Sequence, residues 1–255
     1  MENCLKMKRI FQLFVVLMTS AAIFGCSRIP FRTASFEDLV KYPLSDNSED
    51  SLDVAIFFQY PEAKVANPSL ATMTSGILSI IFDMPADTAG VEANVMAYEE
   101  NLAEFYRNEC SSSSADSHSW FDYLNGYFSG RWRGFVSYIF EYESFHGGAH
   151  PMNTLTASVF RIDTGELVSE GDFFMDGYEK PLGELLTARL PDALENDKDA
   201  LESIFVPEIA PNGNFEVSSS GITYYYQPYE IGPYYLGVIA VNLPWDEVKG
   251  LVRKP

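Results

Sequence analysis

Phe145-His146-Gly147-Gly148-Ala149-His150-Pro151 lies near the middle of the 255-residue chain, at the end of an aromatic run. Two adjacent glycines favour a bend, because glycine reaches backbone angles that other residues avoid and lets another segment approach closely. The proline that follows removes a backbone donor and disfavours a helix. We therefore expect this stretch to be a turn that joins two strands, and we expect the fold to be organised around it.

The two histidines of this turn are the best chemical candidates in the sequence. A spacing of four places two imidazoles on one face of a helix, as in zinc sites, but the glycine pair makes a helix unfavourable here. Three interpretations stay open for His146 and His150: a structural brace, a contact to a ligand, or a metal or acid–base role. We identify no third metal ligand and predict no metal site. The remaining residues of the turn are assigned a structural role: Gly147, Gly148, Ala149 and Pro151.

Periodic patterns on both sides of the turn predict an α+β fold, with a mixed or antiparallel sheet and helices packed on one face. Alternation of apolar and polar residues predicts strands, and apolar spacings of three and four predict helices. Strands are expected at 53–60, 120–132, 134–145, 154–162, 215–217, 222–227 and 234–241. Helices are expected at 68–81, 91–105, 181–190, 197–205 and 244–248.

The N-terminus has the pattern of a secretory signal. Three basic residues between positions 6 and 9 precede an apolar run from Ile10 to Phe24, which is shorter than the roughly 20 residues of a membrane-spanning helix. The run ends in Ile23-Phe24-Gly25-Cys26, which resembles a bacterial lipobox. We expect cleavage before Cys26 and lipidation of its sulfur. The alternative is an ordinary signal peptide with an incidental cysteine.

Changes in composition divide the chain into five segments. After the signal peptide, residues 1–25, we expect a lipid-anchored tether over 26–50, because this stretch is polar and lacks a sustained period. A smaller N-terminal α+β domain follows at 51–110. Six serines then mark 111–119 as a flexible loop, and a C-terminal α+β domain is expected over 120–255.

The charge and the cysteines narrow the possible partners. The formal net charge is −19, and it becomes −21 once the signal segment, with three basic residues and one acidic residue, is removed. Such a charge repels phosphate backbones, so we expect no nucleic-acid partner, and it favours encounter with cationic molecules. Alternatively, the charge only keeps the protein soluble. Cys110 is the one thiol left after Cys26 is lipidated, which excludes an intramolecular disulfide and a cysteine-based metal site.

A second cluster of interest is Tyr224-Tyr225-Tyr226-Gln227-Pro228-Tyr229. On a strand, Tyr224 and Tyr226 point to one side of the sheet and Tyr225 to the other. One row is expected in the core, and the other can form a platform for a sugar or a protein. Aromatic packing between sheet and helices is the alternative. The candidate ligand-binding residues are His146, His150, Tyr224, Tyr226 and Tyr229.

Standard catalytic signatures are absent from the sequence. There is no Gly-x-Ser-x-Gly elbow, no phosphate-binding loop, no His-Glu-x-x-His and no Cys-x-x-Cys. Pairs of carboxylates, such as Asp172 and Asp176, arise by chance in so acidic a chain. We therefore assign no catalytic residue and no cofactor.

Several blocks of residues carry a resemblance to a known family. They are Gly147-Gly148-Ala149-His150-Pro151, Asp163-Thr164-Gly165, Asp172, Phe174, Tyr229-Glu230-Ile231, Pro233-Tyr234, Gly237 and Pro244. In order and spacing they resemble the bacterial domain of unknown function 3298, over roughly Trp120 to Leu251. Residues Leu52 to Asn108 resemble, more weakly, domain of unknown function 4163. The resemblance implies that the C-terminal domain is similar to a lobe of the Hsp70-type ATPase, without ATP hydrolysis.

The resemblance also suggests a function. Members of the family include the extracellular part of an anti-sigma factor that senses lysozyme and the accessory region of a peptidoglycan deacetylase. We expect a lipid-anchored, non-catalytic binding module of the cell envelope, for peptidoglycan or for a cell-wall-active cationic protein such as lysozyme. The alternatives are an envelope hydrolase that uses His146 and His150 with a metal or carboxylate, and a structural or assembly lipoprotein. Ser27 after Cys26 resembles an outer-membrane sorting signal, so we expect the protein to face the periplasm.

Overall fold

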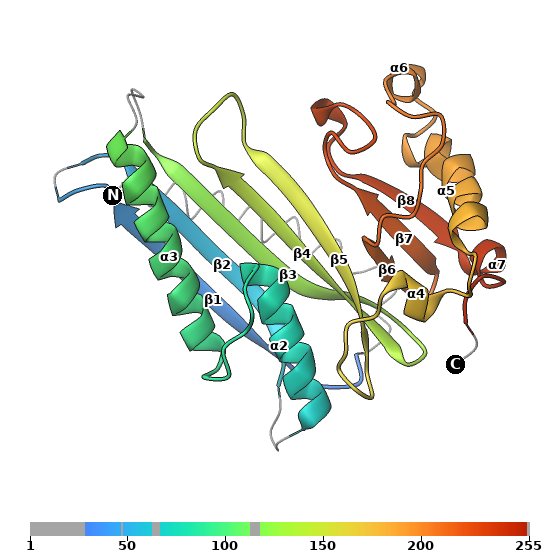
Figure 1. Ribbon diagram of the computed structural model, residues 1–255, viewed down its shortest axis with the longest axis horizontal. Coiled ribbons are helices and arrows are strands. Elements are labelled where there is room, and N and C mark those ends of the chain that lie inside the picture. The colour runs from blue at the N-terminus through green and yellow to red at the C-terminus, as the bar shows by residue number, and fades with distance from the viewer. Residues whose placement is uncertain (1–28, 47, 63–66, 113–117, 254–255) are drawn as a thin grey trace.

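The computed structural model describes residues 29–46, 48–62, 67–112 and 118–253. The predicted signal peptide and Cys26 lie outside these residues, as does most of the predicted serine-rich loop. The described part of the chain has an α+β fold, as predicted, and forms two sheets, each with helices packed against it (Figure 1).

The larger sheet has five strands in the order β1-β2-β3-β4-β5. All neighbours are antiparallel except β2 and β3, which run parallel. Parallel neighbours need a long crossover connection, and two helices between these strands supply it. The strands are β1 (Thr33–Pro43), β2 (Ser51–Pro61), β3 (Trp120–Trp132), β4 (Phe135–Phe145) and β5 (Met152–Arg161). Four of the five were predicted.

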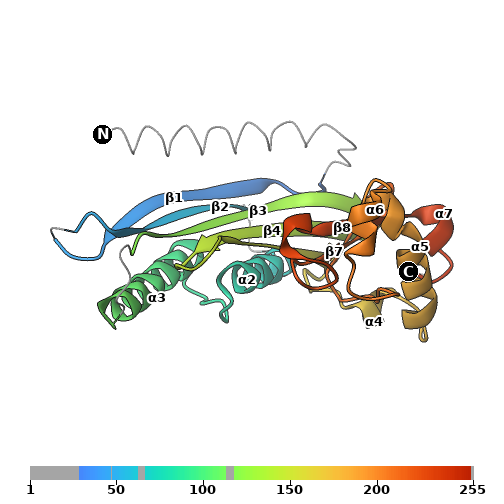
Figure 2. The ribbon, with the colours of Figure 1, turned by 90° about the horizontal axis from the view of Figure 1, so that it is seen from above.

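Two helices cover one face of this sheet (Figure 2). Helix α2 (Pro68–Phe82) begins after Asn67, whose side chain accepts hydrogen bonds from two backbone N–H groups of the first turn. These N–H groups have no partner within the helix, so the cap stabilises its start. The spacing of Leu70, Met73, Ile77 and Ile81 predicts the apolar face of this helix. Three of these four are buried, and the full set of buried residues is Met73, Ile77, Leu78, Ile81 and Phe82.

Helix α3 (Val91–Ser112) packs beside α2. Spacings of three and four predict an apolar face of Val91, Val95, Tyr98, Leu102 and Phe105, with Glu99 outside it, and the structure departs from this face at Glu99 and Phe105. Phe105, which was expected in the core, is 47% exposed, whereas Tyr106 is fully buried. Glu99, expected on the polar face, is only 7% exposed. Where aromatic and charged residues are adjacent in the sequence, spacings of three and four are compatible with more than one buried face of the helix.

The smaller sheet is antiparallel in the order β6-β7-β8 and has its own hydrophobic core. Helices α5 and α7 pack against it. Its strands are β6 (Phe215–Val217), β7 (Gly221–Tyr226) and β8 (Ile239–Pro244). The helices of this unit are α4 (Glu170–Phe173), α5 (Glu179–Ala193), α6 (Lys198–Glu202), the 3-10 turn η1 (Tyr234–Leu236) and α7 (Trp245–Val248).

The two units meet along β5, the edge strand of the larger sheet. The Asn214 side chain accepts a hydrogen bond from Ala157 N–H (2.6 Å) and donates one to the Leu155 carbonyl (2.8 Å). Gln227 accepts from Leu155 N–H (3.0 Å) and donates to the same carbonyl (2.6 Å). An edge strand presents unpaired backbone groups, and here two side-chain amides take the place of a neighbouring strand.

Further contacts fix the smaller unit against the larger sheet. The Ser137 hydroxyl, buried on β4, donates to the Val217 carbonyl (2.9 Å) and accepts from Val217 N–H (2.8 Å). Trp132 stacks on Trp245 with ring centroids 4.1 Å apart. The junction therefore combines backbone hydrogen bonding with aromatic packing.

The predicted tether over 26–50 is wrong at Thr33–Pro43, which is strand β1. Its residues pair continuously with β2 from Thr33↔Pro61 to Pro43↔Ser51. Phe36 and Tyr42 point toward the core, while the residues between them are exposed in alternation. In the sequence, this alternation is a weak signal for a strand, because both the exposed and the inward positions of an edge strand tolerate polar residues. Prolines near the strand weaken the signal further.

Residues 111–119 do not separate two sheets, contrary to the predicted domain boundary. Strand β2 precedes them and β3 follows them, yet these strands are neighbours in one sheet. The two cores instead meet at β5, where Val159 belongs to the core of the smaller unit and Phe160 to that of the larger sheet.

The strand predicted at 234–241 is also wrong in its first half. Tyr234–Leu236 is the turn η1, and Gly237 after it has a positive φ of 65°. β8 is an edge of its sheet with alternating burial, and β7 is the central strand.

Glu99 offers a test of how α3 is held against β1. One of its carboxylate oxygens accepts a hydrogen bond from Tyr42 on β1 (3.1 Å), and the other is buried without a hydrogen-bond partner among the described residues. Burial raises the pKa of Glu99. Because the pKa of Glu99 is higher in the folded than in the unfolded state, its contribution to the free energy of unfolding depends on pH. That contribution is fully present below the unfolded pKa and is lost as the pH rises through the folded pKa.

Glu99→Gln should therefore stabilise the protein at neutral pH by on the order of 1 kcal/mol, because the amide keeps the acceptor for Tyr42 without a charge. Near pH 4, the gain should disappear. Urea unfolding at both pH values measures it, and Glu100→Gln on the exposed side of the same helix is the matched control. An equal gain at both pH values would contradict the assignment.

Candidate functional site

The histidine turn, residues 146–151, connects β4 to β5, as predicted. Gly147 and Gly148 have positive φ angles of 89° and 105°, which glycine adopts without strain. A side chain built at either position would meet no atom within 4 Å. The glycines are therefore needed for the backbone angles rather than for close packing, and the tip of the turn is exposed.

His146 braces the first end of this turn. Its Nε2 lies 2.7 Å from Oδ2 of Asp122, and its ring stacks on Trp120 with centroids 4.5 Å apart. Asp122 is fully buried on β3 and also accepts a hydrogen bond from the Tyr142 hydroxyl. Burial, followed by the nearby Asp122, raises the pKa of Tyr142, so this phenol stays a hydrogen-bond donor. A buried carboxylate needs such partners, which makes His146 a structural brace.

His150 braces the second end and contacts the smaller unit. Its Nδ1 lies 2.9 Å from the carbonyl of Pro151, so this nitrogen carries the proton in neutral histidine. Nε2 can then accept a hydrogen bond from the Tyr229 hydroxyl, 3.3 Å away. The ring stacks on Tyr234 with centroids 3.9 Å apart, and Tyr234 donates to the same Pro151 carbonyl (2.6 Å).

These contacts create an aromatic surface, which we call the tyrosine surface: His150, Tyr229 and Tyr234. Tyr229 is 53% exposed. Tyr229 has a φ of 70°, which is unfavourable for a bulky residue, and such strained conformations cluster at functional sites. A rigid, exposed tyrosine presents apolar area and a polar tip together, so the geometry suits binding rather than catalysis.

Tyr224 and Tyr226, predicted as ligand-binding residues, are instead in the core. Both are at most 1% exposed, and their hydroxyls donate to Glu170 (2.8 Å) and to the Ala210 carbonyl (2.9 Å). Burial raises the pKa of both phenols. Because β7 is the central strand, its even-numbered row faces the core of the smaller unit. Of the five predicted residues, the structure brings His150 and Tyr229 together and places His146 at a separate contact.

Sequence reasoning missed Asp122 and Trp120, the partners of His146. Both lie on β3, more than 20 residues before the turn. A carboxylate at an inward-facing position of an otherwise aromatic strand was the available signal. It could not be paired with His146 before the antiparallel register of β3 and β4 was known.

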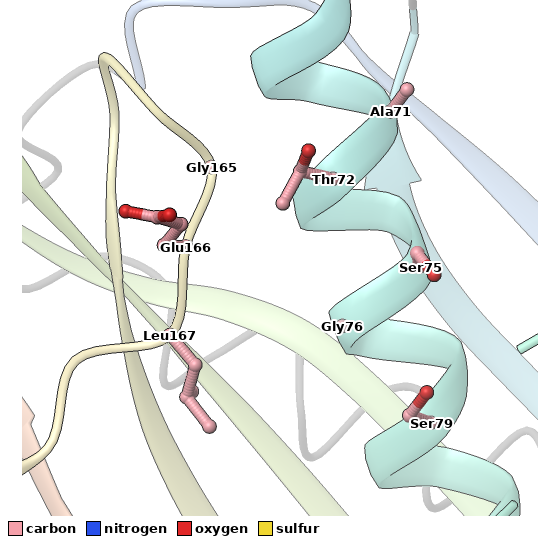
Figure 3. Close-up of a pocket in the computed structure, with 8 residues that line it drawn as sticks. All are labelled: Ala71, Thr72, Ser75, Gly76, Ser79, Gly165, Glu166 and Leu167. Carbon is pink, nitrogen blue, oxygen red and sulfur yellow. The ribbon is translucent and has the colours of Figure 1, made fainter. Parts of the chain in front are cut away.

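Two surface hollows provide further candidates. The hollow in Figure 3 has a volume of about 540 Å³ and lies between α2 and residues 165–167, with small side chains such as Thr72 and Ser75 along its wall. A second, of about 760 Å³, follows β5. Leu167, 57% exposed, lines both. Glu170 in the second hollow already accepts hydrogen bonds from Tyr178, Tyr224 and Gly213 N–H. The hollows therefore fit catalysis poorly.

No group of three or more histidine, cysteine or acidic residues in the described part of the chain could hold a metal ion. Among the helices described, none is long and apolar enough to cross a membrane.

Comparison with known protein families finds a match to the part of the chain that forms most of the smaller unit. Residues 171–246 match the family described as protein of unknown function (DUF3298). The matched range includes Tyr229 and Tyr234 of the tyrosine surface and begins after the histidine turn. The expected resemblance over Trp120 to Leu251 is thus found in its C-terminal part. No curated protein matches the chain.

Two solved structures share the fold of most of the chain. A member of the DUF3298 family from Bacteroides fragilis NCTC 9343 has a TM-score of 0.76 at 21% identity, covering 88% of this chain and 94% of its own. A DUF3298 family protein from Pseudomonas aeruginosa PAO1 has a TM-score of 0.66 at 19% identity, covering 88% and 95%. At these identities the likeness shows a shared fold.

His146→Ala should destabilise the protein by about 2–3 kcal/mol, because it leaves the Asp122 carboxylate buried with one partner fewer. Asp122→Asn with His146→Ala should cost less than the sum of the two single changes, since no charge is then stranded. Denaturant unfolding of the four proteins measures the coupling. Strict additivity would show that His146 does not stabilise Asp122.

Proposed function

We propose that this chain is a non-catalytic binding module of the bacterial cell envelope that recognises a cationic, cell-wall-active protein such as lysozyme. The observation that carries the proposal is the tyrosine surface, on which Tyr229 is held exposed in a strained conformation beside His150. Strain of this kind persists where the surrounding structure enforces it. Tyrosine is also enriched among the residues that contribute most to protein–protein binding.

The charge of the chain supports a cationic partner. A formal net charge of −19 attracts positively charged proteins and accelerates their encounter. Peptidoglycan is the second candidate, because exposed tyrosine rings also suit stacking on sugar rings. The resemblance to a lysozyme-sensing anti-sigma factor and to the accessory region of a peptidoglycan deacetylase motivates both candidates.

We further infer that Cys26 carries a lipid and that the protein faces the periplasm from the outer membrane. The order of basic residues, apolar run and cysteine in the first 26 residues supports this location. The likeness of the C-terminal part to an Hsp70-type ATPase lobe, and of residues 52–108 to domain of unknown function 4163, likewise stay predictions.

The alternative functions have less support. A hydrolase that uses both histidines requires His146 and His150 to act at one place. His146 is bonded to Asp122, whereas His150 is bonded to Pro151 and Tyr229. A structural or assembly lipoprotein would not need an exposed, strained tyrosine.

Tyr229→Ala should weaken binding to lysozyme at least tenfold, as expected for a well-placed tyrosine at an interface. Isothermal titration calorimetry with lysozyme, and sedimentation with purified peptidoglycan, measure the two candidates separately. Binding to lysozyme should also weaken as salt rises, because salt screens surface charges. Leu167→Ala, which removes an equally exposed apolar side chain in the hollows, is the control.

If the chain binds neither lysozyme nor peptidoglycan, the proposal fails. If it binds one of them and Leu167→Ala rather than Tyr229→Ala weakens binding, the function stands but the site is wrong.

A further inference from the structure

Strand β1 leaves one edge of the larger sheet open. Glu62 N–H donates to the Arg32 carbonyl (2.8 Å) and Leu44 N–H donates to the Asp50 carbonyl (3.0 Å), and both pairs continue the β1–β2 register. Even-numbered residues of β1 therefore direct their backbone groups toward β2. Odd-numbered residues direct theirs away from the sheet. Within the described residues, β1 has a strand neighbour on this one side only.

The two edges of the larger sheet differ sharply. At β5, Asn214 and Gln227 bond the outer backbone groups of Leu155 and Ala157, and residues 166 and 168 bond those of Arg161 and Val159. At β1, the outward Leu39 N–H is bonded by the side chain of its own neighbour, Asp38 (2.7 Å). β1 is 11 residues long and pairs with β2 without a bulge. Of the features that commonly block edge pairing, it has a lysine, Lys41, and a proline at its end, Pro43.

We propose that β1 is the interface of a homodimer, in which the β1 strands of two copies pair antiparallel about a two-fold axis at Leu39. The two larger sheets then form one continuous sheet. In this register the outward backbone groups of the odd-numbered residues face each other and can exchange hydrogen bonds. The exceptions are the N–H of Leu39, which Asp38 bonds, and Pro43, which has no N–H. Leu39, 43% exposed, lies opposite Leu39 of the partner subunit, which removes apolar area from water.

The charges of β1 are complementary to themselves in this register. Glu37 lies opposite Lys41 of the partner subunit, and the two-fold axis makes this ion pair twice. Both residues are exposed, and the Lys41 side chain is 56% exposed while its Nζ lies 3.2 Å from Asp53 of its own chain. Opposite charges directly across a strand pair are stabilising, and like charges are destabilising.

The other face of the strand agrees with the same register. Phe36 lies opposite Tyr42 of the partner subunit, so aromatic rings meet on the side that the helices cover. Moving the axis to Asp38 places that carboxylate opposite its own copy, and moving it to Val40 separates Glu37 from Lys41. The axis at Leu39 therefore makes both ion pairs and avoids the Asp38–Asp38 contact.

Charge reversal tests the interface directly. Glu37→Lys and Lys41→Glu each place like charges across the axis twice, so each should weaken self-association at least tenfold. Mixing the two variants restores both ion pairs, so the mixture should form a heterodimer. Sedimentation equilibrium of the full chain, in a detergent matched to the solvent density, measures the mass. Glu208→Lys, an exposed residue of the smaller unit with the same change in charge, is the control and should dimerise like the unchanged protein.

Thermal unfolding shows whether each variant is folded, which matters for Lys41→Glu because the new carboxylate lies beside Asp53. Glu37→Lys disturbs no such contact and is the independent test. If the unchanged protein is monomeric, the proposal is wrong. The edge of β1 would then be open to a strand of another protein. A dimer that survives Glu37→Lys, or a mixture that stays monomeric, overturns it as well.

Discussion

Backbone groups at the edge of a sheet must find partners, and the way this chain satisfies those of β5 determines its architecture. Asn214 and Gln227 supply amide groups to Leu155 and Ala157 in the place of a sixth strand. Carboxamides carry a donor and an acceptor on one planar group, so each can reproduce the hydrogen bonds of a peptide unit. Because Asn214 directly precedes β6 and Gln227 directly follows β7, the smaller sheet is docked at a fixed position on the larger one.

The tyrosine surface depends on the same junction. Gln227, which bonds β5, lies two residues before Tyr229, and its own N–H donates to Glu230 (2.7 Å). The loop that carries Tyr229 is therefore anchored to the larger sheet on one side and to His150 on the other. A binding surface assembled from both units requires both to be folded and docked. The two histidines of the histidine turn have a mainly mechanical role. His146 secures the turn to the buried Asp122, and His150 contacts Tyr229 and Tyr234.

Local patterns in the sequence predicted most of the elements. The turn, the cap at Asn67 and the helices α2, α3 and α5 follow from short-range rules that a few residues satisfy. Edge strand β1 was missed because only alternate residues of an edge strand face the core, and two prolines and a polar run lie nearby. The burial of Tyr224 and Tyr226 depends on which strand is central, and the His146–Asp122 contact depends on register. Both are long-range properties that no window of sequence contains.

The closed edge at β5 also determines what a shortened chain would do. A fragment that ends after β5 would lose Asn214 and Gln227 and would expose unpaired strand edges on both sides of one sheet. One open edge that is complementary to itself gives a closed pair. With two open edges, a second and a third copy can each add a sheet to the growing assembly. Such an assembly has no fixed size, like one built from head-to-tail contacts that do not close into a ring. In the intact chain the smaller unit therefore covers an edge at which the larger sheet would otherwise be open to further strands.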